Sequence, residues 1–180
     1  GIANVVVWPK LVEAFRRDLL ARKGQGERVK LDVAEMRSRV QAAKPAQGAW
    51  DAKNGPGRIM DIELAAQTAA LIAGSPARGV ERQLAAAAAR IMPDSDAQTL
   101  TAAYRLMWRL HAGSRLLSDR ALDWAELGEG GRAFLLRETG AANAETLARE
   151  LAQAVTEAEA AVTRLVGLAD GETGYGSGRG

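Results

Sequence analysis

Apolar residues recur every three or four positions along most of this chain, which is the spacing that places them on one side of an α-helix. The clearest case spans about 144–168. Its apolar positions are Leu147, Leu151, Val155, Ala158, Val162 and Leu165, at steps of 4, 4, 3, 4 and 3. This stripe predicts a long amphipathic helix that buries one face.

The same spacing, combined with residues that begin or end helices, predicts six further helices. Their approximate ranges are 9–23, 27–43, 59–73, 76–91, 96–117 and 132–139. Gly24 and Pro45 end the first two, and Gly140 ends the short one. Ser75 is expected to cap the helix that Pro76 opens. We therefore predict an all-α fold, a bundle of six or seven helices.

Two stretches lack a helical pattern. Residues 46–56 form a predicted loop that contains Gly48 and Gly55. Residues 171–180 are dominated by glycine and have little to bury, so ordering them would cost conformational entropy without an apolar gain. We expect a single helical domain over 1–170, followed by a flexible, disordered tail over 171–180.

The composition narrows the function classes. Hydrophobic residues make up 47% of the chain but aromatic residues only 4%, so the core must consist mainly of Leu, Ile, Val, Met and Ala. The 24 basic residues are interleaved with 22 acidic ones, which predicts a mixed-charge solvated surface and no nucleic-acid partner. No apolar run reaches the roughly 18 residues of a membrane span, and the chain start lacks a signal-peptide pattern. We expect no membrane partner and a cytoplasmic location.

Residues suited to catalysis or metal binding are scarce. The chain has no cysteine and one histidine, His111, so neither a transition-metal site nor a serine-hydrolase triad is expected. Gly55-Pro56-Gly57 is not a phosphate-binding loop, because the Gly-Lys-Ser/Thr ending is absent. We predict no catalytic residue, no metal ligand and no cofactor site in this chain.

The stretch from Lys53 to Gln67 is the most unusual part of the sequence. Two glycines flank a proline directly before a predicted helix, so the backbone there needs special dihedral angles. Asp61 falls in the first turn, where a carboxylate complements the exposed amides. Glu63 and Gln67 are four residues apart and share one face, whereas Asp61 and Glu63 point apart. Spacing alone favours a helix start with a capping acid and an exposed glutamate.

This stretch also resembles a known motif. Residues 53–63 read Lys-Asn-Gly-Pro-Gly-Arg-Ile-Met-Asp-Ile-Glu and precede Gln67. They are similar to the motif of glutamine synthetase adenylyltransferase/adenylyl-removing enzymes, where a lysine, a glycine pair and Asp-Ile-Glu precede a glutamine. The resemblance extends upstream to the Glu-Met-Arg helix at 32–39 and downstream to a long helix at 101–110. It departs at Arg58, where the family usually has a second consecutive glycine.

The resemblance implies a role within a larger enzyme. Asp61, and a chain that ends soon after Leu168, resemble the carboxy-terminal half of that enzyme, which carries out adenylylation. In the family, each helical domain follows a nucleotidyltransferase domain with a Gly-Ser turn and an Asp-x-Asp pair for Mg²⁺. Gly113-Ser114, followed by Asp123 and Glu126, does not match that pattern, so the catalytic domain is absent from this chain.

The resemblance also implies cofactors and partners. ATP and Mg²⁺ belong to the full-length enzyme. Its implied partners are its own upstream nucleotidyltransferase domain, glutamine synthetase and a regulatory signalling protein. Six residues are then expected to face the catalytic domain without taking part in chemistry: Lys53, Gly55, Gly57, Asp61, Glu63 and Gln67. Two alternatives stay open, a stand-alone helical module that binds a protein partner and a relative of the uridylyltransferases.

Overall fold

The computed structural model describes residues 26–88 and 90–166, with the backbone alone for 26–28. These residues form helices α2 (Gly26–Ala43), α3 (Ile59–Ile72), α4 (Val80–Ala88), α5 (Asp94–Leu117), α6 (Glu129–Thr139) and α7 (Ala144–Val166). The ranges described contain no β-strand. The prediction of an all-α bundle is therefore confirmed. The helix expected at 9–23 and the tail expected at 171–180 lie outside the described residues.

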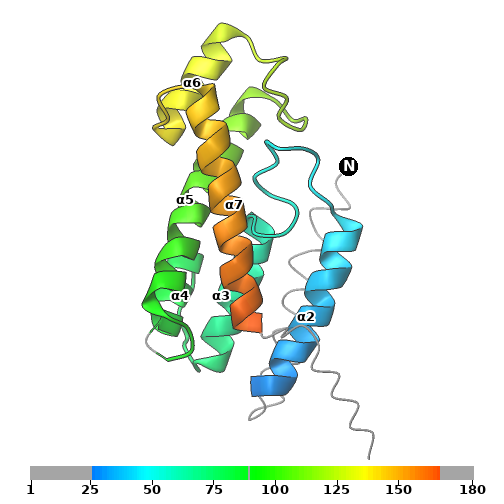
Figure 1. Ribbon diagram of the computed structural model, residues 1–180, viewed down its shortest axis with the longest axis vertical. Coiled ribbons are helices and arrows are strands. Elements are labelled where there is room, and N and C mark those ends of the chain that lie inside the picture. Colours follow the sequence, from blue (N-terminus) through cyan, green and yellow to red (C-terminus); the bar gives the residue numbers. More distant parts are fainter. Residues whose placement is uncertain (1–25, 89, 167–180) are drawn as a thin grey trace, which may run out of the picture.

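The two longest helices, α5 and α7, lie side by side and form the axis of the bundle (Figure 1). Helices α3 and α4 pack against the half of α5 that begins at Asp94, and α6 packs at its other end. Helix α2 contacts α3 and α7 on the outside of the bundle. The long loop between α2 and α3 thus lies close to both α7 and the end of α5.

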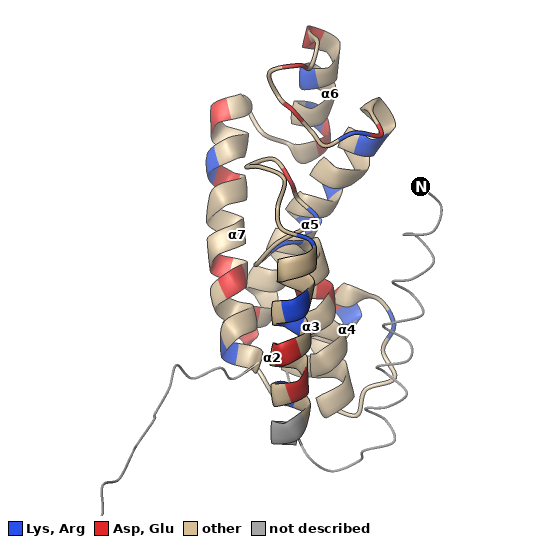
Figure 2. Cartoon of the chain, turned by 90° about the vertical axis from the view of Figure 1, so that its right-hand side faces the viewer, with Lys and Arg blue, Asp and Glu red and all other residues tan. Residues whose placement is uncertain are grey.

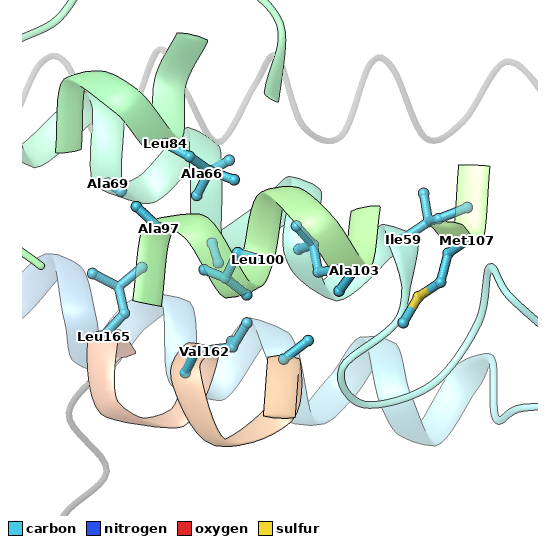
Figure 3. Close-up of a cluster of buried hydrophobic side chains, with 14 of the residues drawn as sticks. Ile59, Ala66, Ala69, Leu84, Ala97, Leu100, Ala103, Met107, Val162 and Leu165 are labelled. Atoms are coloured by element: carbon cyan, nitrogen blue, oxygen red, sulfur yellow. The ribbon is translucent and has the colours of Figure 1, made fainter. Parts of the chain in front are cut away.

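Alanine and leucine side chains fill the space between these helices (Figure 3). Leu100 and Met107 of α5 are fully buried, and Val162 and Leu165 of α7 lie opposite them. Four of the eight buried residues of α3 are alanines, at positions 65, 66, 69 and 70. Small side chains let helix axes approach closely. The predicted stripe on α7 is buried except at Val155, which is half-buried.

Helix α4 corrects one prediction. The helix begins at Val80 and not at Pro76, since Gly79 has a φ of +86°, which a right-handed helix cannot contain. The first helical hydrogen bond runs from the amide of Gln83 to the carbonyl of Gly79. Ser75 accepts a hydrogen bond from the amide of Ala77 at 3.2 Å, so it closes a local turn and does not cap α4.

Other predicted boundaries differ by two or three residues. Helix α5 begins at Asp94, directly after Pro93, and α6 begins at Glu129. The predicted end of α6 is confirmed, because Gly140 takes the left-handed conformation with a φ of +79°. The end predicted for the last helix, at about residue 168, lies outside the described residues.

Acidic and basic residues are interspersed over the helices (Figure 2). Two arginine–carboxylate pairs join elements across the surface: Arg164 of α7 with Asp96 of α5, and Arg105 of α5 with Glu81 of α4. None of the helices in the described ranges is both long and apolar enough to cross a membrane.

Candidate functional site

The loop between α2 and α3, residues 44–58, is organised around Asp51. Its Oδ1 accepts hydrogen bonds from the amides of Lys53 at 2.9 Å and Asn54 at 3.0 Å. Its Oδ2 accepts from the amide of Gln47 at 3.0 Å and the Asn54 side chain at 3.1 Å. Burial alone would raise the pKa of Asp51, but these hydrogen bonds together lower it below its ordinary value. The ionised carboxylate therefore fixes the shape of the loop.

Gly57 brings this loop into direct contact with the backbone of α7. Its φ is +68°, and a Cβ atom at this position would lie 2.2 Å from the carbonyl oxygen of Val155 and 2.8 Å from the amide nitrogen of Glu159. Gly55 also has a positive φ, of +104°, and is buried. The Gly-Pro-Gly turn is thus required for packing inside this chain.

Asp61 faces the interior of the bundle. Its two carboxylate oxygens accept hydrogen bonds from Nε and Nη2 of Arg37, at 2.7 and 2.8 Å. The amide of Gly57 donates to the same carboxylate at 2.7 Å, and Arg37 also donates to Thr163 of α7 at 3.2 Å. The expected contact of Asp61 with another domain does not fit this position, because a buried guanidinium and an amide already satisfy the carboxylate.

Arg58 stands at the position where the resemblance described above leads us to expect a glycine. Its φ of −101° and ψ of −179° are extended, so no glycine is needed there. Its Nε donates to the carbonyl of Asp51 at 2.6 Å, and its Nη1 donates to the carbonyl of Pro56 at 3.4 Å. Arg58 therefore ties the end of the loop to its middle, at Asp51.

The other predicted residues lie on an open side of the molecule. Lys53 is exposed, whereas Glu63 and Gln67 are half-buried on α3. The hydroxyl of Tyr104 in α5 donates a long hydrogen bond of 3.4 Å to the carboxylate of Glu63. The rings of Trp108 and Tyr104 are stacked, with their centroids 6.1 Å apart. We call these five residues the α3–α5 surface. Sequence reasoning missed Tyr104 and Trp108, since no local pattern shows that this part of α5 lies beside α3.

The acid and the phenol on this surface influence each other. Burial raises the pKa of Glu63, while the Tyr104 hydroxyl and the charge of Lys53 lower it only in part. Burial, together with the negative charge of Glu63, raises the pKa of Tyr104 to about 12. Trp108 keeps 50% of its surface exposed. An exposed tryptophan beside partly desolvated polar groups is typical of a protein-contact surface.

A polar cleft of about 350 Å³ lies on the other side of Lys53, between the loop and the end of α5. Its walls are Gln47, Trp50, Asp51, Ala52, Lys53, Asn54, His111, Ser114, Arg115, Asp119, Arg120, Ala121 and Leu122. Trp50 also stacks on Trp124, with ring centroids 4.8 Å apart. This stack holds the loop against the segment that follows α5.

His111 lines this cleft. Burial lowers its pKa, the charges of Lys53 and Arg115 lower it further, and Asp51 opposes them. The imidazole is therefore neutral at pH 7. Within the described ranges, no group of three or more His, Asp or Glu side chains is placed to hold a metal ion.

The Gly113-Ser114 pair has a structural explanation. Both residues lie within α5, and the Ser114 hydroxyl donates to the carbonyl of His111 at 2.8 Å. A Cβ atom at Gly113 would lie 2.8 Å from a methyl group of Leu135, so the glycine lets α6 pack closely. The pair is part of helix packing and not of a nucleotide-binding turn.

Comparisons with known proteins match most of the described region. A family model described as GlnD PII-uridylyltransferase matches residues 28–168.

Three curated relatives are each named bifunctional glutamine synthetase adenylyltransferase/adenylyl-removing enzyme. The protein from Rhizobium meliloti (strain 1021) is 35% identical over 120 residues, 62% of this chain and 12% of the relative. The protein from Caulobacter vibrioides (strain ATCC 19089 / CIP 103742 / CB 15) is 34% identical over 141 residues, which are 75% of this chain and 14% of the relative. The protein from Agrobacterium fabrum (strain C58 / ATCC 33970) is 31% identical over 156 residues, which are 81% of this chain and 16% of the relative. The chain thus spans a small part of the length of these relatives.

Proposed function

Because this chain belongs to the family described as GlnD PII-uridylyltransferase, matched over residues 28–168, we propose that it is the helical domain following a catalytic nucleotidyltransferase domain. The parent protein would be a glutamine synthetase adenylyltransferase, and this domain would come from its carboxy-terminal half. Its role would be to support the catalytic domain and its regulatory contacts, while the chemistry takes place in that domain.

The choice of AMP as the transferred group rests on the relatives. The family description names a uridylyltransferase, whereas the relatives at 31–35% identity are named adenylyltransferases. In the full-length enzyme, a tyrosine oxygen of glutamine synthetase would bond to the α-phosphorus of ATP, the hydroxyl would lose its proton, and pyrophosphate would leave. Mg²⁺ would be held by the catalytic domain, a regulatory signalling protein would control the reaction, and the enzyme would act in the cytoplasm.

The observation that carries this proposal is the division of the 53–67 segment into an anchored side and an open side. Gly57 and Asp61 are fixed from within by α7 and Arg37. Lys53, Glu63 and Gln67 remain on the α3–α5 surface beside Trp108. A rigid surface with an aromatic side chain and both signs of charge suits a permanent neighbouring domain.

Assays of the chain alone address its need for a catalytic domain. We expect the purified chain to be helical by circular dichroism and to transfer no AMP from ATP to glutamine synthetase. Measurable turnover by the purified chain would overturn the proposal that the chemistry belongs to another domain.

Variants of the full-length enzyme address the contact surface. Lys53→Glu reverses an exposed charge on the α3–α5 surface, and we expect about a tenfold fall in adenylyl transfer, the effect of losing about 1.4 kcal/mol of contact energy. Glu150→Lys reverses an exposed charge on α7, away from this surface, and serves as the control. Equal activities of the two variants, both folded, would contradict the proposed contact.

A further inference from the structure

The cleft between the 44–58 loop and the end of α5 has more cationic than anionic side chains. Lys53, Arg115 and Arg120 line it, against the carboxylates of Asp51 and Asp119. Within the described part of the chain, neither Lys53 nor Arg120 forms an ion pair. These two cations therefore remain available to a ligand.

The two carboxylates offset this charge only in part. Both oxygens of Asp51 are already used by four hydrogen bonds within the loop. Asp119 is exposed, as are the three cations, so water screens all four charges, and the backbone carbonyl of Asp119 accepts a hydrogen bond from Arg115 Nη1. The remaining guanidinium nitrogens of Arg115 keep their donors. Donors therefore outnumber free acceptors in the cleft.

The shape of the cleft is fixed before any ligand arrives. The Asp51 hydrogen bonds hold one wall, and the stacking of Trp50 on Trp124 holds that wall against the segment after α5. The volume of about 350 Å³ falls within the range of small-molecule sites. The walls of the cleft are thus preformed, whereas the exposed side chains of Lys53, Arg115 and Arg120 must be ordered when a ligand binds.

We propose that this cleft binds a small oxyanion, the phosphate or carboxylate group of a small molecule, through Lys53, Arg115 and Arg120. Planar guanidinium groups suit both kinds of anion, because they donate two parallel hydrogen bonds. His111 lies in the same cleft and supplies a further donor when protonated. The inference does not depend on the proposed enzyme: of the α3–α5 surface it uses only Lys53, which also lines the cleft.

Nuclear magnetic resonance of His111 provides the test, since this is the only histidine in the untagged chain. A bound anion favours the imidazolium, so inorganic phosphate should raise the pKa of His111 by about half a unit over sodium chloride of equal ionic strength. Succinate forms a parallel titration. A larger effect of phosphate assigns the site to phosphate groups, and a larger effect of succinate assigns it to carboxylates.

Matched variants test which side chains bind. Arg120→Gln, alone and with Arg115→Gln, should raise the anion concentration that gives half of the His111 shift by at least about tenfold, because a charged hydrogen bond is lost. Arg149→Gln removes the same charge from an exposed position on α7 and should leave the response unchanged. The proposal is overturned if chloride alone gives the full shift, if neither anion shifts His111, or if folded Arg120→Gln responds like Arg149→Gln. Adenylyl transfer does not enter this assay, so its outcome is independent of the proposed function.

Discussion

Arg37 and Asp61 form a bidentate ion pair in the interior, with two donor–acceptor distances of 2.7 and 2.8 Å. The residues are 8% and 6% exposed and lie 24 positions apart in the sequence. This pair joins α2 to the first turn of α3. The amide of Gly57 also donates to Asp61, so the ion pair determines how the loop before α3 meets the bundle.

Removing either member of this pair should destabilise the chain strongly. Asp61→Ala leaves the Arg37 guanidinium buried without its counter-charge, so we expect a loss of about 3–5 kcal/mol in the free energy of unfolding. Urea denaturation followed by circular dichroism measures it. The double variant Arg37→Ala/Asp61→Ala should lose less than the sum of the single variants. Additive losses would show that the two side chains do not stabilise each other.

Two glycines with nearly the same φ allow steric contact to be separated from backbone strain. Gly57 (φ +68°) would place a Cβ against the backbone of α7, whereas Gly74 (φ +65°) has nothing within 4 Å. Gly74→Ala should cost about 1–2 kcal/mol, the penalty of a left-handed L-residue. Gly57→Ala should cost clearly more, because α7 must move as well. Thermal unfolding of the two variants gives the comparison, and equal losses would argue against the close approach.

His111 should make the stability of the chain depend on pH below neutrality. Its pKa in the folded chain is below the ordinary value of 6.5, so the unfolded chain binds the proton more tightly. The contribution is fully present above pH 6.5 and is lost as the pH falls through 6.5 toward the folded pKa. Urea denaturation across this window should show the loss in the parent chain and a smaller one in His111→Gln. Identical pH profiles would contradict the prediction.

Tyr104 should titrate late because Glu63 lies beside it. Its pKa is raised to about 12, first by burial and then by the charge of Glu63. Glu63→Gln removes that charge and should lower the pKa of Tyr104 toward 10. Ultraviolet titration of tyrosinate, in a Tyr175→Phe background that leaves one tyrosine, measures the change. Glu81→Gln should have a smaller effect, and the reverse order would place the controlling charge on α4.

Local sequence patterns predicted most of the helices. The ranges expected for α2, α3 and α5 agree with the observed ones to within two residues, since apolar spacing and end signals act over a few positions. The predicted start of α4 was wrong. Ser75 and Pro76 form a helix-start signal, but the positive φ of Gly79 prevents a helix from beginning there. A dihedral angle of this kind follows from how the connection must turn back onto α3, which lies outside the local pattern.

The candidate site was predicted less well than the fold. The 53–67 segment was identified as unusual, but its spacing could not show which side chains face inward. Arg37 of α2 pairs with Asp61, which is buried. Tyr104 of α5 covers one side of Glu63, which is therefore half-buried. The cleft was not foreseen, since Trp50 and Trp124 come from distant parts of the chain.

By itself, the sequence determined that this chain is helical, which faces of its long helices are apolar, and that residues 53–67 resemble an adenylyltransferase motif. These properties depend on residue types at short spacing. Only the tertiary structure decided that Gly57 contacts α7, that Asp61 pairs with Arg37, and that Lys53 borders both the α3–α5 surface and the cleft. Contacts between distant residues depend on how whole helices pack, and the spacing within any one helix does not specify that packing.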